Sequence, residues 1–517
     1  MPEWVLFLIF FLPLSTGLLL GLSILVGLNR GEAGERFTSA ISLISTGIVL
    51  LSLAGTLIYS LIYHWPGLQE LYPWFVSGEL KITLVLLLDP LSITVANVFC
   101  LLLMTAMYFS VFYLHREAGY QRFFMFLNLF LEAILLITLS GNAFTAFVGW
   151  ELAGLCSFML IAYAYDRPTS STHAVRVFII NRIGDAGFIL SLVLSSMWLG
   201  DTNWSSINEN MRSLSPVQSS LIMSGFVLAA LVKSAQVPFS SWITRALEGP
   251  TPSSAIFYGS LLVHAGVFLL LRLQGAVDSA EGLKVMIFIL AGLTLLYGWL
   301  CGLVQTDIKT ALIMSTIAQV ALMFIAIAAG WYLLAVIHML VHALWRMYQM
   351  LSAPSFNHLV SRPARSVPAW LQHRKLLLTA ALQRFWLDHV ADWLIVRPVY
   401  LFARDIRQFD ERIVNRIVGL SAQVNALTSF TEYKEFKRGN ALASKTLTGG
   451  RGILGAVMEP VASMLQWFEE KLVLQGSGEG LVNVLLNFGR SLQHIDELLS
   501  EPRYLWLIIL ITMIIML

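Results

Sequence analysis

Charged residues are scarce in this chain of 517 residues: only 12% are Asp, Glu, Lys or Arg, whereas 57% are hydrophobic. Soluble globular proteins carry about a quarter charged residues, so the composition excludes an ordinary soluble protein. The mean hydropathy of +0.74 agrees with this exclusion. The formal net charge is only +2, which gives no indication of nucleic-acid binding. The sequence therefore predicts a polytopic membrane protein.

Cysteine is also scarce, and Cys100, Cys156 and Cys301 lie singly inside apolar segments. Without a CxxC pair or another cluster, a disulfide framework, an iron–sulfur site or a cysteine-based zinc site is not expected. No nucleotide-binding loop or nucleophile motif is present either. We therefore expect no cofactor, no metal and no catalytic site in this chain. The opening residues 1–28 are too apolar and too long for a signal-peptide core, and they predict a retained first membrane helix.

Long apolar runs are the main feature of the sequence. Twelve of them can cross about 30 Å of hydrocarbon, namely residues 4–28, 38–63, 91–114, 121–140, 143–164, 173–199, 217–247, 252–272, 283–303, 309–329, 331–352 and 503–517. They predict an all-α polytopic membrane protein with about twelve transmembrane helices. Residues 66–90 predict an outside hairpin or loop. We divide the chain into N-terminal helices with this hairpin (1–120), a core (121–352), a lateral amphipathic region (353–502) and a terminal anchor (503–517).

The loops between these runs differ in charge. Arginines collect on one side and acidic residues on the other, the arginines being Arg30, Arg36, Arg116, Arg122, Arg167 and Arg176. The positive-inside rule then predicts an outside N-terminus and a cytoplasmic first loop. The basic segment after the eleventh span should also be cytoplasmic. We expect a multi-pass protein of a bacterial inner membrane.

Residues 373–500 have a different residue pattern, in which apolar and charged residues are interleaved at helical spacing. This pattern is typical of helices that lie along the membrane surface or against partner proteins. Two interpretations stay open: the helices anchor only their own chain, or they form a surface for other membrane subunits on the cytoplasmic side. The length of the region favours the second.

Several ionisable residues fall inside the apolar runs, where a charge costs about 2.5–3.5 kcal/mol by insertion scales. Arg176 and Lys309 are near span ends and can snorkel to the interface. The others need partners or water, and they mark a candidate ion pathway. The full set is Glu132, Glu151, Arg176, Arg182, Asp185, Lys233, His264, Lys309, His338, His342 and Arg346.

Glu151 heads the run GWELAGLCSFMLIAYAY, followed by small residues that let another helix approach closely. Arg182 and Asp185 are three apart and can pair along one helix face. That pair is either an internal salt bridge for packing or a group that tunes Glu151 by offering it a cation.

Lys233 stands five residues before Pro238. Proline inside a helix removes a hydrogen bond and breaks the ladder, so Lys233 should lie beside a broken helix, where irregular backbone lines a cavity. Burial penalises an ammonium group, so such a lysine can gain and lose a proton. A purely structural lysine is the alternative.

His338, His342 and Arg346 are spaced four apart and share one helical stripe. Imidazoles can relay protons near neutral pH. Packing histidines are the alternative, and a metal site is not favoured because no third ligand is evident. Together with Glu151 and Lys233, these histidines predict a row of titratable groups at mid-membrane, with the Arg182–Asp185 pair and Arg346 setting the field.

The motifs GWELAGLCSFMLI, NRIGD, VKSAQVPFSSWITRALEGPTPSSA, LVQTDIKTALIMSTIAQ and HMLVHALWR occur in this order. Together they resemble the antiporter-like proton-translocating subunits of respiratory complex I, and most of all the large distal subunit of the chain 5 or L type. Mrp antiporters and the membrane subunits of inorganic-carbon accumulation complexes are related to it. The resemblance runs from about 74 to 350. It resumes at 385–418, which is similar to the start of that subunit's lateral helix.

The resemblance implies a role for each candidate. Glu151 matches the essential glutamate of the family, Lys233 the central lysine, and Arg182 with Asp185 the modulating pair. His338 and His342 match the bridging histidines. Glu132 and Lys309 are further modulating charges. The implied activity is proton conduction within a multi-subunit assembly, without a catalytic site in this chain, as in an NADH:quinone oxidoreductase-type translocase.

Three departures from the family pattern matter. Tyr258 stands where the family usually has a histidine, and His264, six residues later, either substitutes for it or only packs. Arg346 replaces an expected lysine and is a fixed charge, because a guanidinium stays protonated in proteins. The chain also passes from SAPSFNHLV almost directly to the lateral element, without the second broken helix and its exit-side lysine.

The sequence therefore leaves three functions open. The chain conducts protons in a complex I-like assembly, serves an inorganic-carbon accumulation complex driven by cation flux, or acts as a structural clamp that has lost transport. The buried charges at Glu151 and Lys233 favour transport, because a clamp does not need them. The histidines favour protons over sodium.

Overall fold

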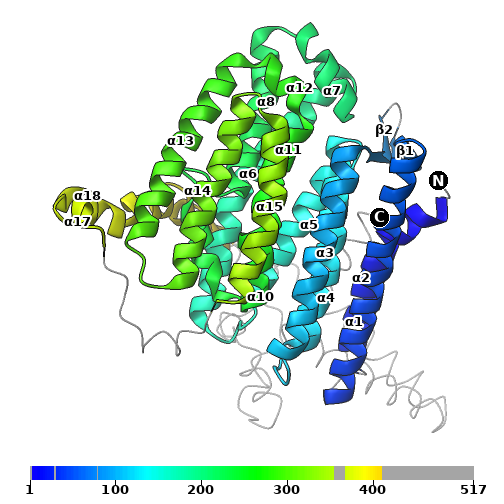
Figure 1. Ribbon diagram of the computed structural model, residues 1–517, viewed down its shortest axis with the longest axis horizontal. Helices are drawn as coiled ribbons and strands as arrows, with labels where there is room; N and C mark the ends of the chain where they lie inside the picture. The colour runs from blue at the N-terminus through cyan, green and yellow to red at the C-terminus, as the bar shows by residue number, and fades with distance from the viewer. Residues whose placement is uncertain (1–2, 28, 30, 78–79, 354–366, 410–517) are drawn as a thin grey trace, which may run out of the picture. The chain divides into compact units, whose positions relative to one another are not determined.

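The computed structural model describes residues 3–27, 29, 31–77, 80–353 and 367–409. Within these ranges the chain is almost entirely helical (Figure 1). The described residues up to Val396 form one compact unit, and the helix Arg397–Phe409 belongs to a second. Each unit is therefore described by itself.

Ten helical segments of the described ranges are long and apolar enough to cross a membrane. They overlap the first ten predicted spans, although the seventh ends at Lys233 and not at 247, and the chain is an all-α polytopic membrane protein. The segments are α1 (Glu3–Val26), α2 (Gly31–Ile62), α3 (Pro90–Tyr113), α4 (Tyr120–Leu139), α5 (Ala143–Ile161), α6 (Pro168–Leu199), α8 (Pro216–Lys233), the composite span Thr251–Arg272, α13 (Glu281–Leu303) and α14 (Ile308–Ala328).

The eleventh predicted span is α15 (Tyr332–Leu351), a 20-residue helix that packs against α14. Its two histidines and its arginine lower its hydropathy, and it is not among the ten segments above. The twelfth predicted span, 503–517, lies outside the described residues.

Polar side chains cap the starts of several spans. Asp89 accepts a hydrogen bond from the Ser92 amide at 2.8 Å and caps α3, and Asn142 does the same for α5. A capping box of Ser215 and Gln218 starts α8. Such caps satisfy amides that have no partner within the helix, so the sequence fixes where these spans begin.

The predicted hairpin is confirmed as two antiparallel strands, β1 (Gly67–Ser77) and β2 (Leu80–Leu88), with Gly67 opposite Leu88. An isolated bridge joins Leu86 to Ser140 at the end of α4. Figure 1 shows the hairpin at the same end of the bundle as the short helices α7 (Trp204–Asn210) and α12 (Gln274–Ser279), with α10 toward the other end. The 3₁₀ turn η1 (Met211–Ser213) follows α7.

The helix that carries Pro238 is broken, as its position predicts. α8 ends at Lys233, Ala235 takes a positive φ of 52°, and helical structure resumes only with α9 (Ser241–Arg245) and η2 (Ala246–Glu248). The following span is itself irregular. It consists of α10 (Thr251–Ser254), the π-helical turn η3 (Ala255–Ser260), the 3₁₀ turn η4 (Leu262–His264) and α11 (Ala265–Arg272).

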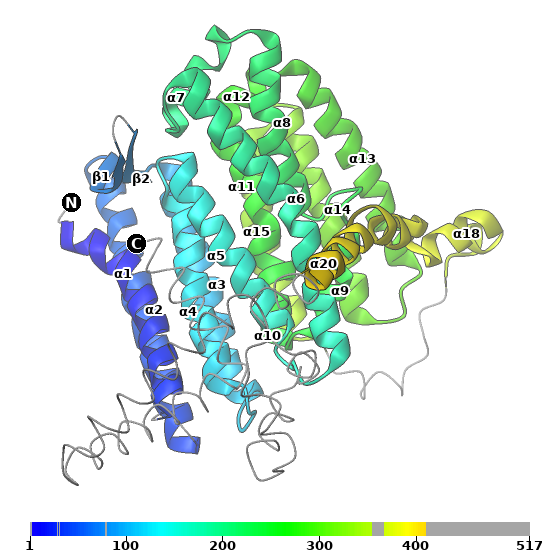
Figure 2. The ribbon, with the colours of Figure 1, turned by 180° about the vertical axis from the view of Figure 1, so that it is seen from behind.

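The residues after the bundle return to it. α17 (Ala369–Gln372) and α18 (Lys375–Leu382) pack near the end of α13, where Leu371 and Ala381 cluster with Val304. The segments η5 (Arg384–Trp386), α19 (Leu387–Ala391) and η6 (Asp392–Val396) follow, and α9 and α6 contact α19 and η6 (Figure 2).

The second unit is represented by α20 (Arg397–Phe409), in which exposed apolar and charged side chains interleave. This agrees with the amphipathic pattern expected for the lateral region. The remainder of that region, from 410 onward, lies outside the described residues.

Candidate functional site

Lys233, the last residue of α8, is buried, with only 2% of its surface exposed. Its Nζ lies 3.5 Å from the carbonyl oxygen of Trp150 on α5 and 4.9 Å from the centroid of the same indole ring. A side chain at Gly154, one turn along α5, would place its Cβ 3.5 Å from Nζ. The ammonium group is therefore held against one face of α5, by a carbonyl and by the π-face of an aromatic ring.

Two carboxylates complete this cluster. Asp185 on α6 lies 3.9 Å from Nζ of Lys233 and accepts a 3.0 Å hydrogen bond from the indole N–H of Trp150. Arg182, one turn earlier on α6, approaches Asp185 at 3.5 Å and donates a short hydrogen bond to Glu151. The structure thus brings together Glu151 and Lys233 of the predicted row with the predicted modulating pair, Arg182 and Asp185.

The cluster contains two cations and two carboxylates, so its formal charge is balanced. Arg182 contacts both carboxylates and is therefore shared between Glu151 and Asp185. The side chains of Arg182 and Glu151 are 42% and 21% exposed on the chain, whereas Lys233 and Asp185 are buried. The Arg182–Glu151 end of the cluster is thus accessible, and the Lys233–Asp185 end is enclosed. Adding or removing one proton changes the net charge of the enclosed end, where electrostatic interactions are strongest.

The broken helix connects this cluster to a second one. Ser234, next to Lys233, donates a 2.8 Å hydrogen bond to the carbonyl of Val263, which precedes His264. No hydrogen bond among the residues seen in the structure joins Lys233 directly to His264. The two clusters are neighbours through the backbone at the break in α8.

The second cluster is a directed chain of hydrogen bonds. Nδ1 of His264 lies 2.7 Å from the carbonyl of Ser260, so it carries the hydrogen, because a carbonyl can only accept. Its Nε2 then accepts from Nδ1 of His342 at 2.9 Å. Nε2 of His342 in turn accepts from the guanidinium of Arg346 at 3.4 Å. Both imidazoles are thereby fixed as Nδ1–H tautomers.

The remaining members of the predicted row are close to this chain. His338 lies with its ring centroid 6.1 Å from that of His342, and its Nε2 is 2.9 Å from the side-chain oxygen of Gln319. Arg346 also donates to the hydroxyl of Ser315 at 3.0 Å. α14 therefore contributes two polar side chains that hold α15 in place.

Other predicted residues lie elsewhere. Lys309 donates a 2.7 Å hydrogen bond to the hydroxyl of Thr251. Arg176 pairs with Asp392 at 2.9 Å and donates to the Asp388 carbonyl. Tyr258 is fully buried with no hydrogen-bond partner on its hydroxyl.

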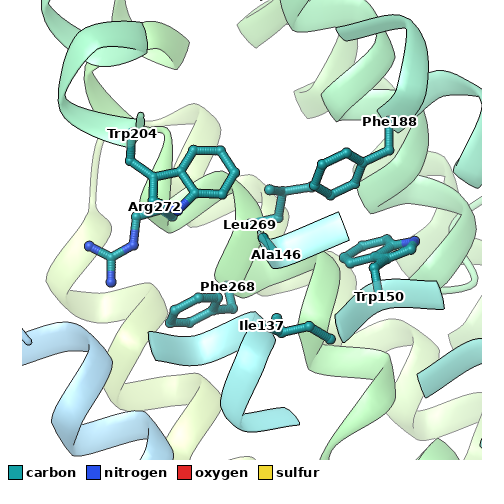
Figure 3. A pocket seen from close by; sticks show the side chains of 8 residues that line it. All are labelled: Ile137, Ala146, Trp150, Phe188, Trp204, Phe268, Leu269 and Arg272. Carbon is teal, nitrogen blue, oxygen red and sulfur yellow. The ribbon is translucent and has the colours of Figure 1, made fainter. Parts of the chain in front are cut away.

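A small cavity of about 10 Å³ lies beside Trp150 and has room for about one water molecule. Figure 3 shows Trp150 and Phe188 on one side of it and Trp204 and Arg272 on the other. Its full lining is Ile137, Ala146, Trp150, Phe188, Trp204, Phe268, Leu269 and Arg272. The cavity is mostly apolar, and it separates Trp150 from the charged end of α11.

At that end, Arg272 pairs with Asp89 at 2.5 Å and also donates to the hydroxyl of Ser92. Burial acts to raise the pKa of Asp89, but the hydrogen bond and the charge of Arg272 more than offset it and hold that pKa below its usual value. The pair therefore ties the start of α3 to the end of α11 in its ionised form.

Sequence reasoning missed Trp150, which contacts both Lys233 and Asp185. The signal was its position directly before Glu151, since adjacent residues on a helix point about 100° apart and can face two different neighbours. Ser315 and Gln319 were also missed. Their spacing of four on α14 places both on the face that meets α15.

Comparison with known proteins gives two family matches. Residues 140–376 match the family described as "NADH:quinone oxidoreductase/Mrp antiporter, TM". Residues 74–124 match "NADH-Ubiquinone oxidoreductase (complex I), chain 5 N-terminus". Every residue of the two clusters lies within the first range.

Curated relatives agree with these matches. The chain is 32% identical over 292 residues to NADH-quinone oxidoreductase subunit L of Mycobacterium tuberculosis, covering 56% of this chain and 46% of the relative. It is 34% identical over 286 residues to NADH-ubiquinone oxidoreductase chain 5 of Hippopotamus amphibius, with coverages of 55% and 47%. For subunit L of Escherichia coli K12 the identity is 30% over 348 residues, with coverages of 64% and 55%. The chain thus spans about half the length of these relatives.

A solved structure shows the same fold. The structure of the Mrp complex from Dietzia sp. DQ12-45-1b contains a chain that aligns with a TM-score of 0.58 at 19% identity, covering 99% of this chain and 62% of that one.

Proposed function

Because the chain belongs to the antiporter-like subunit family of complex I and the Mrp antiporters, we propose that it conducts protons as a membrane subunit of a complex I-like assembly. The observation that carries this proposal is the position of Lys233. It is an enclosed ammonium at the end of a broken span, within 4 Å of a carboxylate and of a backbone carbonyl. A buried charge of this kind is costly in a membrane and marks an ion pathway.

The cluster around Lys233 works as a charge switch. While Arg182 stays on Glu151, Asp185 is the counter-ion of Lys233. If Arg182 moves to Asp185, which already lies 3.5 Å away, Lys233 loses part of its stabilisation and releases its proton more readily. Arg182 thereby couples the accessible carboxylate, Glu151, to the protonation of the enclosed lysine.

The histidine chain carries the proton further. A proton that arrives at one imidazole releases a proton from the other nitrogen of the same ring, so a chain of histidines can pass it on. Arg346 is a fixed donor at the far end of the chain, on Nε2 of His342. Because a guanidinium cannot accept a proton, this bond must break before a proton can leave through Nε2 of His342; the permanent charge of Arg346 opposes a second positive charge on that ring.

Partner subunits are the natural complement of this chain. The family relatives are subunits of larger complexes by name. The segment 384–396 is fixed to α6 and α9 by Arg176 and Arg245, which pair with Asp392 and Asp388. A partner that binds 384–396 would therefore contact a segment tied to α6, which carries Asp185, and to α9, which follows the break after Lys233.

The test replaces Lys233 in the assembled complex. Proton flux is measured in membrane vesicles or proteoliposomes with a pH-sensitive dye, and assembly is followed by native electrophoresis. Lys233→Ala should abolish flux while the complex remains intact. Lys284→Ala is the matched control, because Lys284 pairs with Asp278 near the start of α13, away from both clusters.

Two results would change the conclusion. Unchanged flux through an intact complex of the Lys233 variant would leave a structural clamp as the function. Flux that depends on bicarbonate or carbon dioxide, and on the presence of a soluble zinc protein, would assign the chain to an inorganic-carbon accumulation complex.

A further inference from the structure

Glu132 lies in the middle of α4 and is 5% exposed. One of its carboxylate oxygens, Oε2, is buried without a hydrogen-bond partner. The cluster around Lys233 consists of Glu151, Arg182, Asp185 and Lys233 and does not include this residue. A carboxylate in such a place is costly unless it is paired or protonated.

Among the described residues no cation pairs with Glu132. The elements packed against α4 are α1, α2, α3, α5 and β2, together with η3, whose Phe257 meets Phe130. Their charged residues, with the one on α4 itself, are Glu3, Glu32, Glu35, Arg36, Lys81, Arg122 and Glu151. The other titratable residues of these elements are tyrosines and cysteines, namely Tyr59, Cys100, Tyr108, Tyr113, Tyr120, Cys156 and Tyr258.

Two of the charged residues just named are cations on helices, Arg36 and Arg122, and both lie far from Glu132 along the helix axes. Arg122 stands ten residues earlier on α4, which is about 15 Å at 1.5 Å per residue. α2 runs alongside α4 with Ser42 bonded to Asn128 at 2.9 Å, so Thr46 is level with Glu132. Arg36 again lies ten residues, or about 15 Å, before that level. Among the side chains that the structure describes, the carboxyl group therefore has no counter-charge on the helices packed against it.

A row of buried polar side chains leads toward Glu132 along α2. Glu35, Ser39, Ser42 and Ser45 are spaced by four, three and three residues, so they lie on one face of the helix, and all are buried. The row starts where Glu35 meets His115 at 2.8 Å, a side chain that is 53% exposed. At its inner end Ser45 accepts a 2.9 Å hydrogen bond from Thr16 of α1.

α1 contributes an acceptor about one helical turn beyond the level of Glu132. Gly17 and Gly21 face Leu129 and Met125 of α4, so the two helices run antiparallel and Pro13 comes level with Glu132. Proline has no N–H, and the carbonyl four residues earlier, that of Ile9, is left without its helical partner. A neutral carboxyl group can donate to such a carbonyl, whereas a carboxylate cannot.

We propose that Glu132 is a second proton-binding site, which holds a proton in the resting protein and exchanges it along the Ser39–Ser42–Ser45 row with the end of the bundle where His115 lies. This site is distinct from the Glu151–Lys233 cluster. It uses α1, α2 and α4, which Figures 1 and 2 show side by side at one edge of the bundle. The proposal revises the expectation that Glu132 is a modulating charge.

The first test labels the intact complex at pH 7 with dicyclohexylcarbodiimide, which reacts with protonated carboxyl groups in apolar surroundings. Peptide mass spectrometry then compares Glu132 with Glu151, which is paired with Arg182. Faster labelling of Glu132, abolished by Glu132→Gln, supports the proposal. Labelling of Glu132 no faster than that of Glu151 overturns it, and this comparison needs no variant that has to fold.

The second test follows the route. The carbonyl stretch of a protonated Glu132, identified by its loss in Glu132→Gln, shifts when D₂O replaces water, and the rate of this shift reports proton exchange. Ser42→Leu should slow the exchange several-fold. Ser52→Leu, at a position that is not fully buried and bonds only within its own helix, should leave it unchanged. Equal exchange rates in both variants would overturn the route. Neither readout depends on Lys233. A negative result for Glu132 therefore leaves the proposed function unaffected, and a negative result for Lys233→Ala leaves the Glu132 proposal unaffected.

Discussion

Nδ1 of His342 donates to Nε2 of His264 across 2.9 Å and so joins α15 to the irregular span that follows the broken helix. The bond makes His264 a member of the histidine chain and places it between Ser260 and His342. His264 thus lies within the hydrogen-bonded chain, a position that supports the first of the two alternatives left open by the sequence, a proton-transfer residue in place of the usual histidine.

His264→Phe should reduce proton flux strongly, by about 100-fold if His264 transfers protons as a positioned acid–base group does. Flux is measured in vesicles containing the assembled complex. Tyr258→Phe is the control, because that hydroxyl lies in the same span and has no hydrogen-bond partner. Equal flux in the two variants would show that His264 only packs.

Trp150→Phe separates the two functions of the indole. It keeps an aromatic face near Lys233 but removes the hydrogen bond to Asp185, which should cost about 1.5–3 kcal/mol because the acceptor is charged. Thermal unfolding in detergent measures the loss. Trp204→Phe removes a bond to the neutral carbonyl of Ser140 and should cost only about 1 kcal/mol. A larger loss for Trp204→Phe would contradict this assignment.

Arg176→Ala should release the segment 384–396 from α6. Arg176 is mostly buried and makes two hydrogen bonds, to the Asp392 side chain and the Asp388 carbonyl, so its loss should cost about 1.5–3 kcal/mol. Limited proteolysis should then cut near residues 384–396 more quickly. Arg404→Ala removes an exposed pair with Asp405, and it should leave both stability and cleavage unchanged.

Asp89→Asn should destabilise the protein in a pH-dependent way. The folded-state pKa of Asp89 lies below its usual value, so the ion pair with Arg272 contributes fully above the unfolded pKa of about 3.9. The contribution is lost as the pH falls through the folded pKa. The difference in Tm between wild type and variant should therefore be largest near neutral pH and shrink in acid. A difference independent of pH would mean that the charge of Asp89 contributes nothing.

Gly225→Ala should disrupt the contact between α6 and α8. A Cβ at Gly225 would lie 2.3 Å from both the Gly187 carbonyl oxygen and the Ser191 hydroxyl, so the helices must separate. Overpacking of this kind costs about 1–3 kcal/mol, and it would also move Lys233 at the end of α8. Gly55→Ala is the control, since nothing lies within 4 Å of a Cβ there. Equal Tm values for the two variants would refute the close contact.

Much of the fold follows from the sequence alone, because long apolar runs leave few alternatives to a spanning helix. The break after Lys233 also follows, since Pro238 cannot continue the helical ladder. The irregular form of 251–272 could not be predicted, because no proline or glycine pattern marks the π-helical and 3₁₀ turns, and the π-helical turn packs against α15, a contact that sequence periodicity does not reveal.

The residues of the two clusters were also partly predictable from the sequence. The spacing of Arg182 and Asp185 and the stripe of His338, His342 and Arg346 identified groups on single helices. Contacts between helices were not predictable, because periodicity gives the face of a helix but not the residue opposite. Trp150 against Lys233 and His264 against His342 are both contacts of this kind.

The size of the cavity beside Trp150 decides whether water can form a continuous path through this part of the bundle. The cavity holds about one water molecule and is lined mostly by apolar side chains between Trp150 and Arg272, so it cannot hold a continuous file of water. If the chain conducts protons as proposed, a water column there would let protons leave the cluster around Lys233 without passing the histidine chain.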